Sequence, residues 1–203
     1  MEILSSGAEA FIYLDEISGE KVIRKVRVKK RYRIEELDDR LRRARTRREV
    51  KLMVAARRAG VRVPFVLDVK DYEIIMEYIP GERLDDHLRR SPEKTERLAE
   101  ELGILVGRLH LAGIAHNDLT VANVIIHEEE LCILDFGLGE FSSSVEERAV
   151  DLLVLERSIR SSIDDPDLFL EAFVRGYKAV MGDEAEHVLK RIDQVRKRGR
   201  YHG

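Results

Sequence analysis

The sequence predicts an α+β protein with two lobes: a small β-rich amino-terminal lobe with one long helix, and a compact α-helical carboxy-terminal lobe. Strand-type segments at 10–14 and 21–28 flank a turn signal at 15–19, and segments 65–69 and 72–78 return to strand character. Apolar spacing over 35 to about 58 suits one long helix. After Pro80-Gly81 the apolar spacing is mainly helical. We therefore place the lobes at residues 1–79 and 80–203.

Each element has its own start and stop signals. The long helix carries a narrow apolar stripe, and Gly60 and Pro64 end it. Ser91-Pro92-Glu93 supplies a capping hydroxyl, a proline for the first helical position and an acid, and Gly113 ends the helix that follows. Two short strands are expected at 124–127 and 131–134, and further helices at 145–161, 167–180 and 184–197.

Composition bounds the class of protein. A chain of 203 residues with 44% hydrophobic and 37% charged residues can bury a core without disulfides or a structural metal. The single cysteine, Cys132, lies in an apolar run, which indicates a buried thiol in a reducing compartment. No apolar stretch approaches the roughly 20 residues that cross a bilayer. The first residues lack a charged leader. We expect a cytoplasmic protein that does not contact a membrane.

Charge is distributed unevenly along the chain. The formal net charge is -3, yet residues 21–62 hold 18 Lys and Arg against 5 Asp and Glu. A second basic cluster closes the chain between 190 and 200. Such runs are typical of a solvated helix face, but they also suit a surface for nucleic acid or an acidic partner. Both interpretations stay open at this point.

One stretch carries the chemistry. Residues 116–123 read His-Asn-Asp-Leu-Thr-Val-Ala-Asn, and Asp135-Phe136-Gly137 follows the two short strands. If these strands pair around 128–130, Asn123 lies opposite Asp135 at one end of the hairpin. An amide and a carboxylate oxygen are ligands suited to Mg²⁺. Asp118 can then accept a proton from, or orient, an attacking hydroxyl or water.

This ordered set resembles the catalytic loop and metal-binding Asp-Phe-Gly element of the protein-kinase superfamily, and the resemblance covers nearly the whole chain. It implies ATP and Mg²⁺ as cofactors, with Asn123 and Asp135 as metal ligands and Asp118 as the catalytic residue. It also implies that Lys25 holds the α- and β-phosphates and pairs with Glu49. The segment 76–79 resembles the hinge, where the backbone of Glu77 and Ile79 would bind adenine and Met76 would back the pocket.

Several positions depart from ordinary kinases. The nucleotide loop has one glycine where ordinary kinases have three, and its expected ligand-binding residues are Gly7, Ala8, Glu9 and Ala10. Asn117 replaces the arginine that senses a phosphorylated activation loop, and Thr120 replaces a lysine that touches the γ-phosphate. No Ala-Pro-Glu element follows Gly137. A conventional peptide-substrate site is therefore not expected.

Taken together, these features resemble the small atypical Ser/Thr kinase family of the KEOPS complex, which includes PRPK and is related to the RIO kinases. The match rests on segments 6–10, 25–33, 45–49, 116–123 and 149–152. It implies an ATPase or kinase subunit that works beside the tRNA-modifying threonylcarbamoyl transferase and other KEOPS subunits. Asp151 would brace the catalytic loop through its backbone. The basic helix over 40–51 and the tail at 198–203 would face tRNA or the partner.

Two other functions remain open. One is a RIO-like protein kinase that acts on a specific partner, and the other is a non-catalytic scaffold that ATP merely stabilises. A small-molecule kinase of the aminoglycoside type is disfavoured by Phe136 and by the compact carboxy-terminal lobe. His116 is expected to brace the catalytic loop, since Asp118 already serves as the acceptor of protons.

Overall fold

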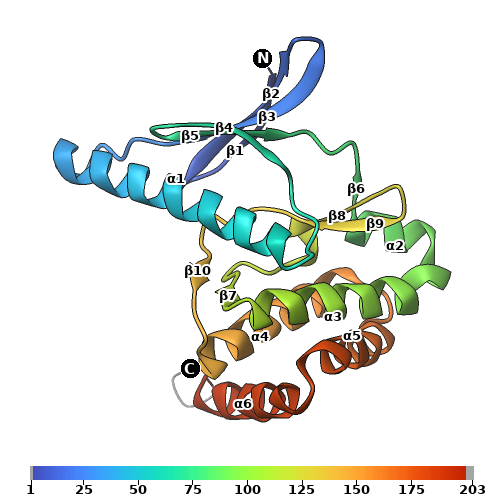
Figure 1. The fold of residues 1–203 in the computed structure, drawn as a ribbon. Coiled ribbons are helices and arrows are strands. Elements are labelled where there is room, and N and C mark those ends of the chain that lie inside the picture. Colours follow the sequence, from blue (N-terminus) through green and yellow to red (C-terminus); the bar gives the residue numbers. More distant parts are fainter. Residues whose placement is uncertain (1, 200–203) are drawn as a thin grey trace. The chain divides into compact units, whose positions relative to one another are not determined.

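The computed structural model describes residues 2–199, with the side chains of 2–196. The chain divides into two compact units, Met1–Val54 with Pro64–Pro80 and Ala55–Val63 with Gly81–Gly203 (Figure 1). The second unit thus includes residues 55–63, which the sequence analysis assigned to the amino-terminal lobe. Hydrogen bonds explain this, because the Ile133 N–H donates to the carbonyl of Arg62 at 3.0 Å and Arg108 donates to that of Gly60 at 2.8 Å.

The first unit contains a five-stranded antiparallel sheet in the order β1-β2-β3-β5-β4. Its strands are β1 (Glu2–Ser6), β2 (Ala10–Ile17), β3 (Glu20–Arg27), β4 (Val66–Lys70) and β5 (Glu73–Glu77). Ser18 and Gly19 both have positive φ, so a two-residue turn joins β2 to β3. Four of the five strands are predicted from the sequence. Strand β1 is not predicted, because all five of its residues are exposed and no apolar alternation marks it.

Helix α1 (Glu35–Arg58) is the long helix of the prediction, and its predicted bounds are confirmed. Acidic residues occupy its first turn and arginines its last, which suits the helix dipole. Figure 1 shows α1 running beside the sheet of the first unit. Its inward face buries apolar residues together with three polar ones, Asp38, Thr46 and Glu49. Of these, Glu49 belongs to the charged cluster described below.

The second unit is mainly helical, as predicted. Its helices are α2 (Leu84–Arg90), α3 (Thr95–Leu111), α4 (Val145–Ser162), α5 (Pro166–Met181) and α6 (Asp183–Gly199), with 3-10 turns η1 (Pro92–Lys94) and η2 (Val121–Asn123). Its short strands are β6 (Glu82–Arg83), β7 (Ile114–Ala115), β8 (Val124–His127), β9 (Glu130–Ile133) and β10 (Glu140–Phe141). Helix α2 is not predicted, because it has only seven residues and no capping side chain.

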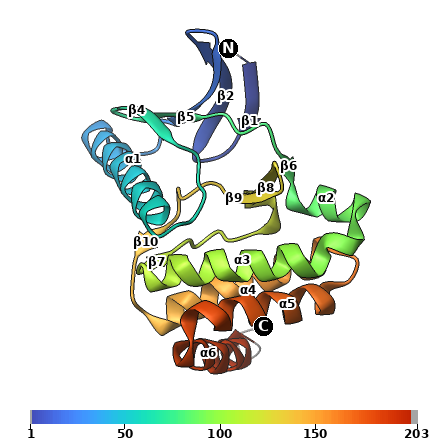
Figure 2. The same ribbon diagram turned by 45° about the vertical axis from the view of Figure 1, so that its right-hand side comes forward.

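Helices α3 and α5 pack closely in the second unit (Figure 2). Glycines permit this approach: a Cβ on Gly103 would lie 2.1 Å from the carbonyl oxygen of Phe173, and one on Gly176 would lie 2.0 Å from that of Glu100. Cys132 is a buried thiol, as expected. Among the helices described here, none combines the length and hydropathy required to cross a bilayer.

Candidate active site

A buried charged cluster joins β3 to α1 in the first unit. The Nζ of Lys25 donates to the Oε1 of Glu49 at 2.6 Å, and the guanidinium of Arg27 donates to the Oε2 of the same carboxylate. All three residues are buried. The structure therefore brings Lys25 and Glu49 together, and it adds Arg27, which the sequence analysis missed. The period of two along a strand could have found it, since residues 25 and 27 share one face of β3.

The loop between β1 and β2 is a tight, tethered turn. The Gly7 N–H donates to the carbonyl of Ala10 at 3.1 Å, and the Val28 N–H donates to that of Glu9 at 3.1 Å. A Cβ on residue 7 would lie 3.3 Å from the Ala10 oxygen, so this glycine allows the turn to close. Ala8 is exposed between them, and the carboxylate of Glu9 pairs with Arg45 at 2.5 Å. The backbone of the expected nucleotide loop is thus held in place.

The predicted hinge residues lie at and after the end of β5. Met76 and Ile79 are buried, and Glu77 is the last residue of the strand. The Glu77 N–H already donates to the carbonyl of Phe65 at 2.8 Å, and its side chain accepts from the Phe65 N–H at 3.0 Å. The backbone N–H of Glu77 is therefore engaged within the sheet.

In the second unit, the hairpin of β8 and β9 has a different register from the predicted one. Val124 pairs with Ile133, and the Leu134 N–H donates to the Asn123 carbonyl at 2.8 Å, so Asn123 lies opposite Leu134. The prediction that Asn123 lies opposite Asp135 is wrong by one residue. The turn contains two residues, Glu128 and Glu129, which both adopt positive φ, where three were expected. Asn123 and Asp135 nevertheless remain at the same end of the hairpin.

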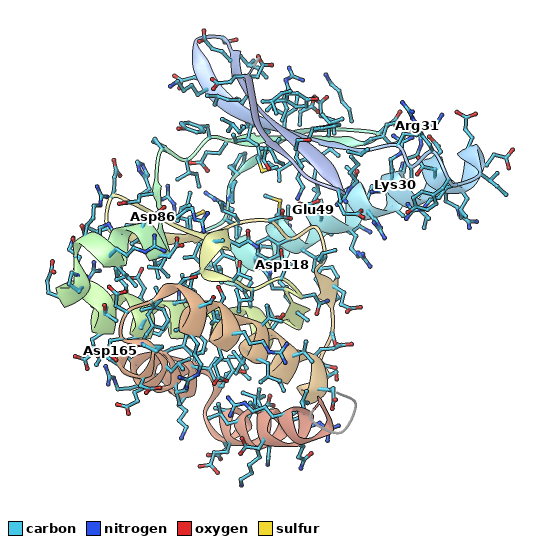
Figure 3. The ribbon with its side chains drawn as sticks, turned by 180° about the vertical axis from the view of Figure 1, so that it is seen from behind. Lys30, Arg31, Glu49, Asp86, Asp118 and Asp165 are labelled. Carbon is cyan, nitrogen blue, oxygen red and sulfur yellow. The ribbon has the colours of Figure 1, made fainter. Side chains whose placement is uncertain are left out.

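Asp118 and Asn123 are in direct contact. The Nδ2 of Asn123 donates to the backbone oxygen of Asp118 at 2.8 Å and to its Oδ2 at 3.1 Å. These two bonds assign the amide orientation, with Nδ2 toward Asp118 and Oδ1 on the opposite side of the group. The side chains of both residues are half-buried (Asp118 is labelled in Figure 3). The catalytic candidate is thus held by the metal-ligand candidate five residues later in the chain.

Asp135 has an uncommon backbone conformation. Its φ is 56°, in the left-handed region that Asp and Asn tolerate better than most residues, and its Oδ1 accepts from the Gly137 N–H at 3.0 Å. The next residue, Phe136, is buried against the ring of His116, with ring centroids 4.8 Å apart. The buried phenylalanine anchors the segment, while the Asp135 residue is exposed.

The loop that carries Asp118 is fixed from within. Both oxygens of the fully buried Asp151 on α4 accept backbone N–H groups, Oδ2 from His116 and Oδ1 from Asn117, each at 2.6 Å. The bracing role predicted for Asp151 is confirmed. The Nδ1 of His116 accepts from the Asp118 N–H at 3.3 Å while Nε2 donates to the Leu134 carbonyl at 2.9 Å, so His116 also braces the loop.

The side chain of Asn117 makes two hydrogen bonds that the sequence did not indicate. Its φ is 62°, and its Nδ2 donates to the carbonyl of Leu138 at 3.2 Å and to the Oε1 of Glu140 at 2.9 Å. The residue that stands where ordinary kinases have an arginine thus binds the short segment after Gly137 directly. No local sequence pattern marks Glu140 as its partner.

A buried chain of hydrogen bonds extends behind Asp151. The Nε2 of His110 on α3 lies 3.4 Å from the Asp151 Oδ2, and its Nδ1 lies 2.8 Å from the hydroxyl of Tyr177 on α5. Burial lowers the pKa of His110, and the neighbouring carboxylate only partly opposes this. Burial also raises the pKa of the Tyr177 hydroxyl. A neutral His110 therefore donates Nε2–H to Asp151 and accepts from Tyr177.

The donors at this end of the hairpin fit a hard cation. They are the amide oxygen of Asn123 and the carboxylate of Asp135, and oxygen ligands of this kind suit Mg²⁺. Within residues 2–199, no cluster of three or more His, Cys, Asp or Glu is arranged to hold a metal. A metal ion bound by Asn123 and Asp135 would need further ligands from other groups. The basic tail at 198–203 lies outside the residues whose side chains are described.

Comparison with known proteins identifies relatives of the whole chain. The family model of the RIO domain matches residues 15–159. The chain is 41% identical over 212 residues to the KEOPS complex subunit Bud32 of Pyrococcus abyssi, covering 99% of this chain and 96% of that protein. It is 41% identical over 182 residues to the "Probable serine/threonine-protein kinase BUD32 homolog" of Archaeoglobus fulgidus, covering 90% and 89%.

A third relative is longer. The chain is 41% identical over 201 residues to the "Probable bifunctional tRNA threonylcarbamoyladenosine biosynthesis protein" of Methanosarcina barkeri. The match covers 98% of this chain but only 36% of that protein, so the chain spans about a third of such bifunctional relatives.

Two solved structures share the fold. One is the Rio2 kinase of Chaetomium thermophilum in an ADP/Mg²⁺–phosphoaspartate complex, with a TM-score of 0.67 and 18% identity over 98% of this chain and 70% of that chain. The other is WaaP in complex with acyl carrier protein, with a TM-score of 0.64 and 17% identity over 97% and 88%. The predicted kinase-like fold is therefore confirmed.

Proposed function

The chain belongs to the RIO-domain family, where Bud32 proteins match it along nearly its whole length, and we propose that it is an ATP-dependent phosphotransferase and ATPase. In this proposal it acts as the kinase-like subunit of a KEOPS complex and supports threonylcarbamoyladenosine modification of tRNA. The names of its relatives support this assignment, which places the threonylcarbamoyl transferase and the other KEOPS subunits among its partners.

One observation carries the catalytic part of the proposal. Asn123 contacts Asp118 through two hydrogen bonds, and Asp135 lies at the same end of the hairpin. In the proposed reaction, Asp118 orients the attacking oxygen of water or of a Ser/Thr hydroxyl and accepts its proton. The brace from Asp151 holds the loop in place, so little reorganisation is needed when the substrate binds.

The proposed metal ligands are Asn123 and Asp135. Bound Mg²⁺ would supply charge neutralisation on the phosphates of ATP, which phosphoryl transfer requires. The amide of Asn123 is suited to this role because its Nδ2 is engaged by Asp118. The left-handed φ of Asp135 and its bond to the Gly137 N–H set the direction of that carboxylate.

The first unit would bind the nucleotide. Lys25 would hold the α- and β-phosphates while Glu49 fixes the position of its ammonium group. Arg27 keeps Glu49 charged and in place, so Lys25 can shift toward a phosphate without leaving the carboxylate unpaired. The backbone of the loop over Gly7, Ala8, Glu9 and Ala10 would approach the phosphates. The Glu77 carbonyl and the backbone of Ile79 would bind adenine, with Met76 beside the ring.

The proposal is tested by following γ-labelled ATP with Mg²⁺ and counting both free phosphate and protein-bound label. The informative variant is Asp135→Asn, because Asn tolerates the left-handed backbone and can still accept from the Gly137 N–H. Loss of the carboxylate charge should lower phosphate release by about 100-fold or more, the scale of removing one group that stabilises the transition state. Asp164→Asn removes another exposed carboxylate of the second unit and should leave the rate unchanged.

The result also separates the alternatives. Release of free phosphate that rises when the transferase and tRNA are added supports an ATPase subunit. Stoichiometric label on a protein hydroxyl, with little free phosphate, indicates a RIO-like protein kinase. If neither the wild type nor the variant turns over ATP in any mixture, the catalytic proposal is wrong and the chain is a nucleotide-stabilised scaffold.

A further inference from the structure

Within the second unit, the short segment that follows Asp135 lies against the loop that carries Asp118. Strand β10 of this segment pairs with β7 in antiparallel register, with Glu140 opposite Ala115 (Figure 2). The ladder fixes the backbone of the two residues of β10. Residues 137–139, which connect Asp135 and Phe136 to β10, precede this ladder, so other contacts must set their position.

These three residues form a turn that two glycines make adaptable. Gly137 and Gly139 flank Leu138, and the Gly139 N–H donates to the carbonyl of Phe136 at 3.0 Å. The Gly137 N–H donates to the Oδ1 of Asp135 at 3.0 Å. The direction of the Asp135 carboxylate therefore depends on where this turn is held.

The side chain of Asn117 holds the turn. Its Nδ2 donates to the carbonyl of Leu138 at 3.2 Å and to the Oε1 of Glu140 at 2.9 Å. An amide NH₂ group has two hydrogens, and these two acceptors use both of them. The backbone N–H of the same residue donates to the Oδ1 of the buried Asp151 at 2.6 Å. Asn117 thus connects the Asp151 brace to the turn beside Asp135.

Glu140 is an anchored acceptor for this amide. Its backbone is fixed in β10 opposite Ala115, two residues before Asn117 in the chain. Its side chain is half-buried, and a hydrogen bond to a carboxylate is roughly twice as strong as one between neutral groups. The carboxylate therefore fixes the Asn117 side chain in the position from which it also reaches the Leu138 carbonyl.

We propose that Asn117 is a positioning residue that directs the Asp135 carboxylate toward the metal, through the Leu138 carbonyl and the Gly137 N–H, and that Glu140 anchors its amide. The inference rests on the proposed function, in which Asp135 binds Mg²⁺. The contact needs no phosphate on the segment, because a glutamate side chain supplies the negative charge. Groups that orient a metal ligand in this way commonly set the affinity of the site.

The first test measures amide hydrogen exchange by NMR on the full chain, without nucleotide or metal. Asn117→Gly removes both side-chain bonds, and glycine keeps the backbone φ of 62° without strain. Exchange of the Gly137 and Gly139 amides should become about 10-fold faster, the factor for loss of one hydrogen bond to a charged group. The control Ser18→Gly makes the same kind of change at a φ of 54° in the first unit and should leave both rates unchanged.

The second test measures ATP binding with Mg²⁺ and with EDTA, together with phosphate release over a range of Mg²⁺ concentrations. Asn117→Gly should weaken ATP by about 10-fold with Mg²⁺ and leave the affinity in EDTA unchanged. Phosphate release should fall at low Mg²⁺ and recover when Mg²⁺ is saturating, which a general loss of structure would not allow. Glu140→Ala should act in the same direction, and Glu140→Gln, which keeps an acceptor for Asn117, should restore most of the loss.

Two results would overturn the inference. One is an exchange rate at Gly137 that Asn117→Gly does not change, and the other is an equal loss of ATP affinity with Mg²⁺ and with EDTA.

Failure of this inference can be distinguished from failure of the proposed function. Unchanged exchange in Asn117→Gly, with a wild type that hydrolyses ATP, refutes the positioning role of Asn117 alone. Faster exchange and weaker Mg²⁺-dependent ATP binding in a chain that never turns over ATP would support the positioning role and refute the proposed function.

Discussion

The two units hold their candidate site residues by different means. In the first unit, buried side chains of opposite charge bind one another: one carboxylate, Glu49, is shared by Lys25 and Arg27. In the second unit, buried side chains bind the backbone, since Asp151 accepts the N–H groups of His116 and Asn117. A charge cluster tolerates movement of one member if another remains paired, whereas a loop held through its backbone keeps a single conformation.

The two ways of holding residues suit two different roles in the proposed reaction. A lysine that must exchange a carboxylate for a phosphate benefits from a counter-charge that keeps a second partner. A loop that must present Asp118 and Asn123 in one geometry benefits from hydrogen bonds to its backbone, such as those that Asp151 accepts. Variants that remove the shared or bracing groups should therefore act differently in the two units.

The largest effect on stability is expected at Glu49. Glu49→Gln removes the buried carboxylate that Lys25 and Arg27 share, and breaking a buried pair in this way costs about 3–5 kcal/mol. Lys25→Met leaves the Arg27–Glu49 pair intact and should cost much less, about 1 kcal/mol. Urea unfolding of both variants measures the difference. Equal costs would contradict the idea that Glu49 is the shared member.

The next largest loss of stability is expected when the Asp151 brace in the second unit is removed. Asp151→Asn keeps one acceptor oxygen and turns an NH₂ group toward a backbone N–H, so one buried donor loses its partner, at a cost of about 2 kcal/mol. Phosphate release should fall while ATP affinity stays near its original value.

Asp165→Asn is the control for this variant. Asp165 caps α5 by accepting from the Leu168 N–H, and Asn caps helices equally well. A variant at 151 as stable as this control would show that the brace does not hold the loop.

Acidification should destabilise the second unit through His110. Its pKa in the folded protein is lowered by burial, so the unfolded chain binds more protons as the pH falls below about 6.5. The stability that neutral His110 contributes is present above that pH and is lost below it, with a limiting slope of about 1.4 kcal/mol per pH unit.

Measurement of the unfolding free energy of His110→Asn between about pH 5 and 7 checks this. The number of protons bound on unfolding should be smaller by close to one in this variant than in the wild type. The exposed His187 on α6 gives the control His187→Asn, which should keep the wild-type slope. If His110→Asn keeps the wild-type slope of unfolding free energy against pH, groups other than His110 cause that slope.

The smallest effect is expected on the surface of the first unit. Arg43 is 38% exposed and pairs with Asp39 at 2.8 Å, so Arg43→Gln should cost less than about 1 kcal/mol. The cost should shrink further in high salt, because exposed pairs are screened. A cost comparable to that of Glu49→Gln would show that burial is not what separates strong from weak ion pairs here.

The sequence predicts elements with strong local signals and misses those without them. The bounds of α1 follow from its acidic start, its apolar stripe and the glycine after it. Strand β1 has five exposed residues, and α2 has seven residues without a side-chain cap, so neither carries a pattern to detect. The predicted hairpin register is wrong because Glu128 and Glu129 adopt positive φ, which glutamates rarely do.

The site shows the same limit. Asp118, Asn123 and Asp135 belong to one short stretch, and the structure brings Asn123 into contact with Asp118. Arg27 could have been found from the alternation of β3. His110 and Tyr177 are 67 residues apart and meet only because α3 and α5 pack at glycines, which no local pattern encodes.

The most direct test of the proposed metal site is calorimetric measurement of ATP binding, once with Mg²⁺ and once with EDTA. Lys25→Met should weaken the binding of ATP in both conditions, because Lys25 would contact the phosphates directly. Asp135→Asn should weaken the binding of ATP by about 10-fold or more only when Mg²⁺ is present, because Asp135 would act through the metal. If Asp135→Asn binds ATP as the wild type does in both conditions, or loses the same affinity in both, the assignment of the metal to the end of the β8–β9 hairpin is wrong.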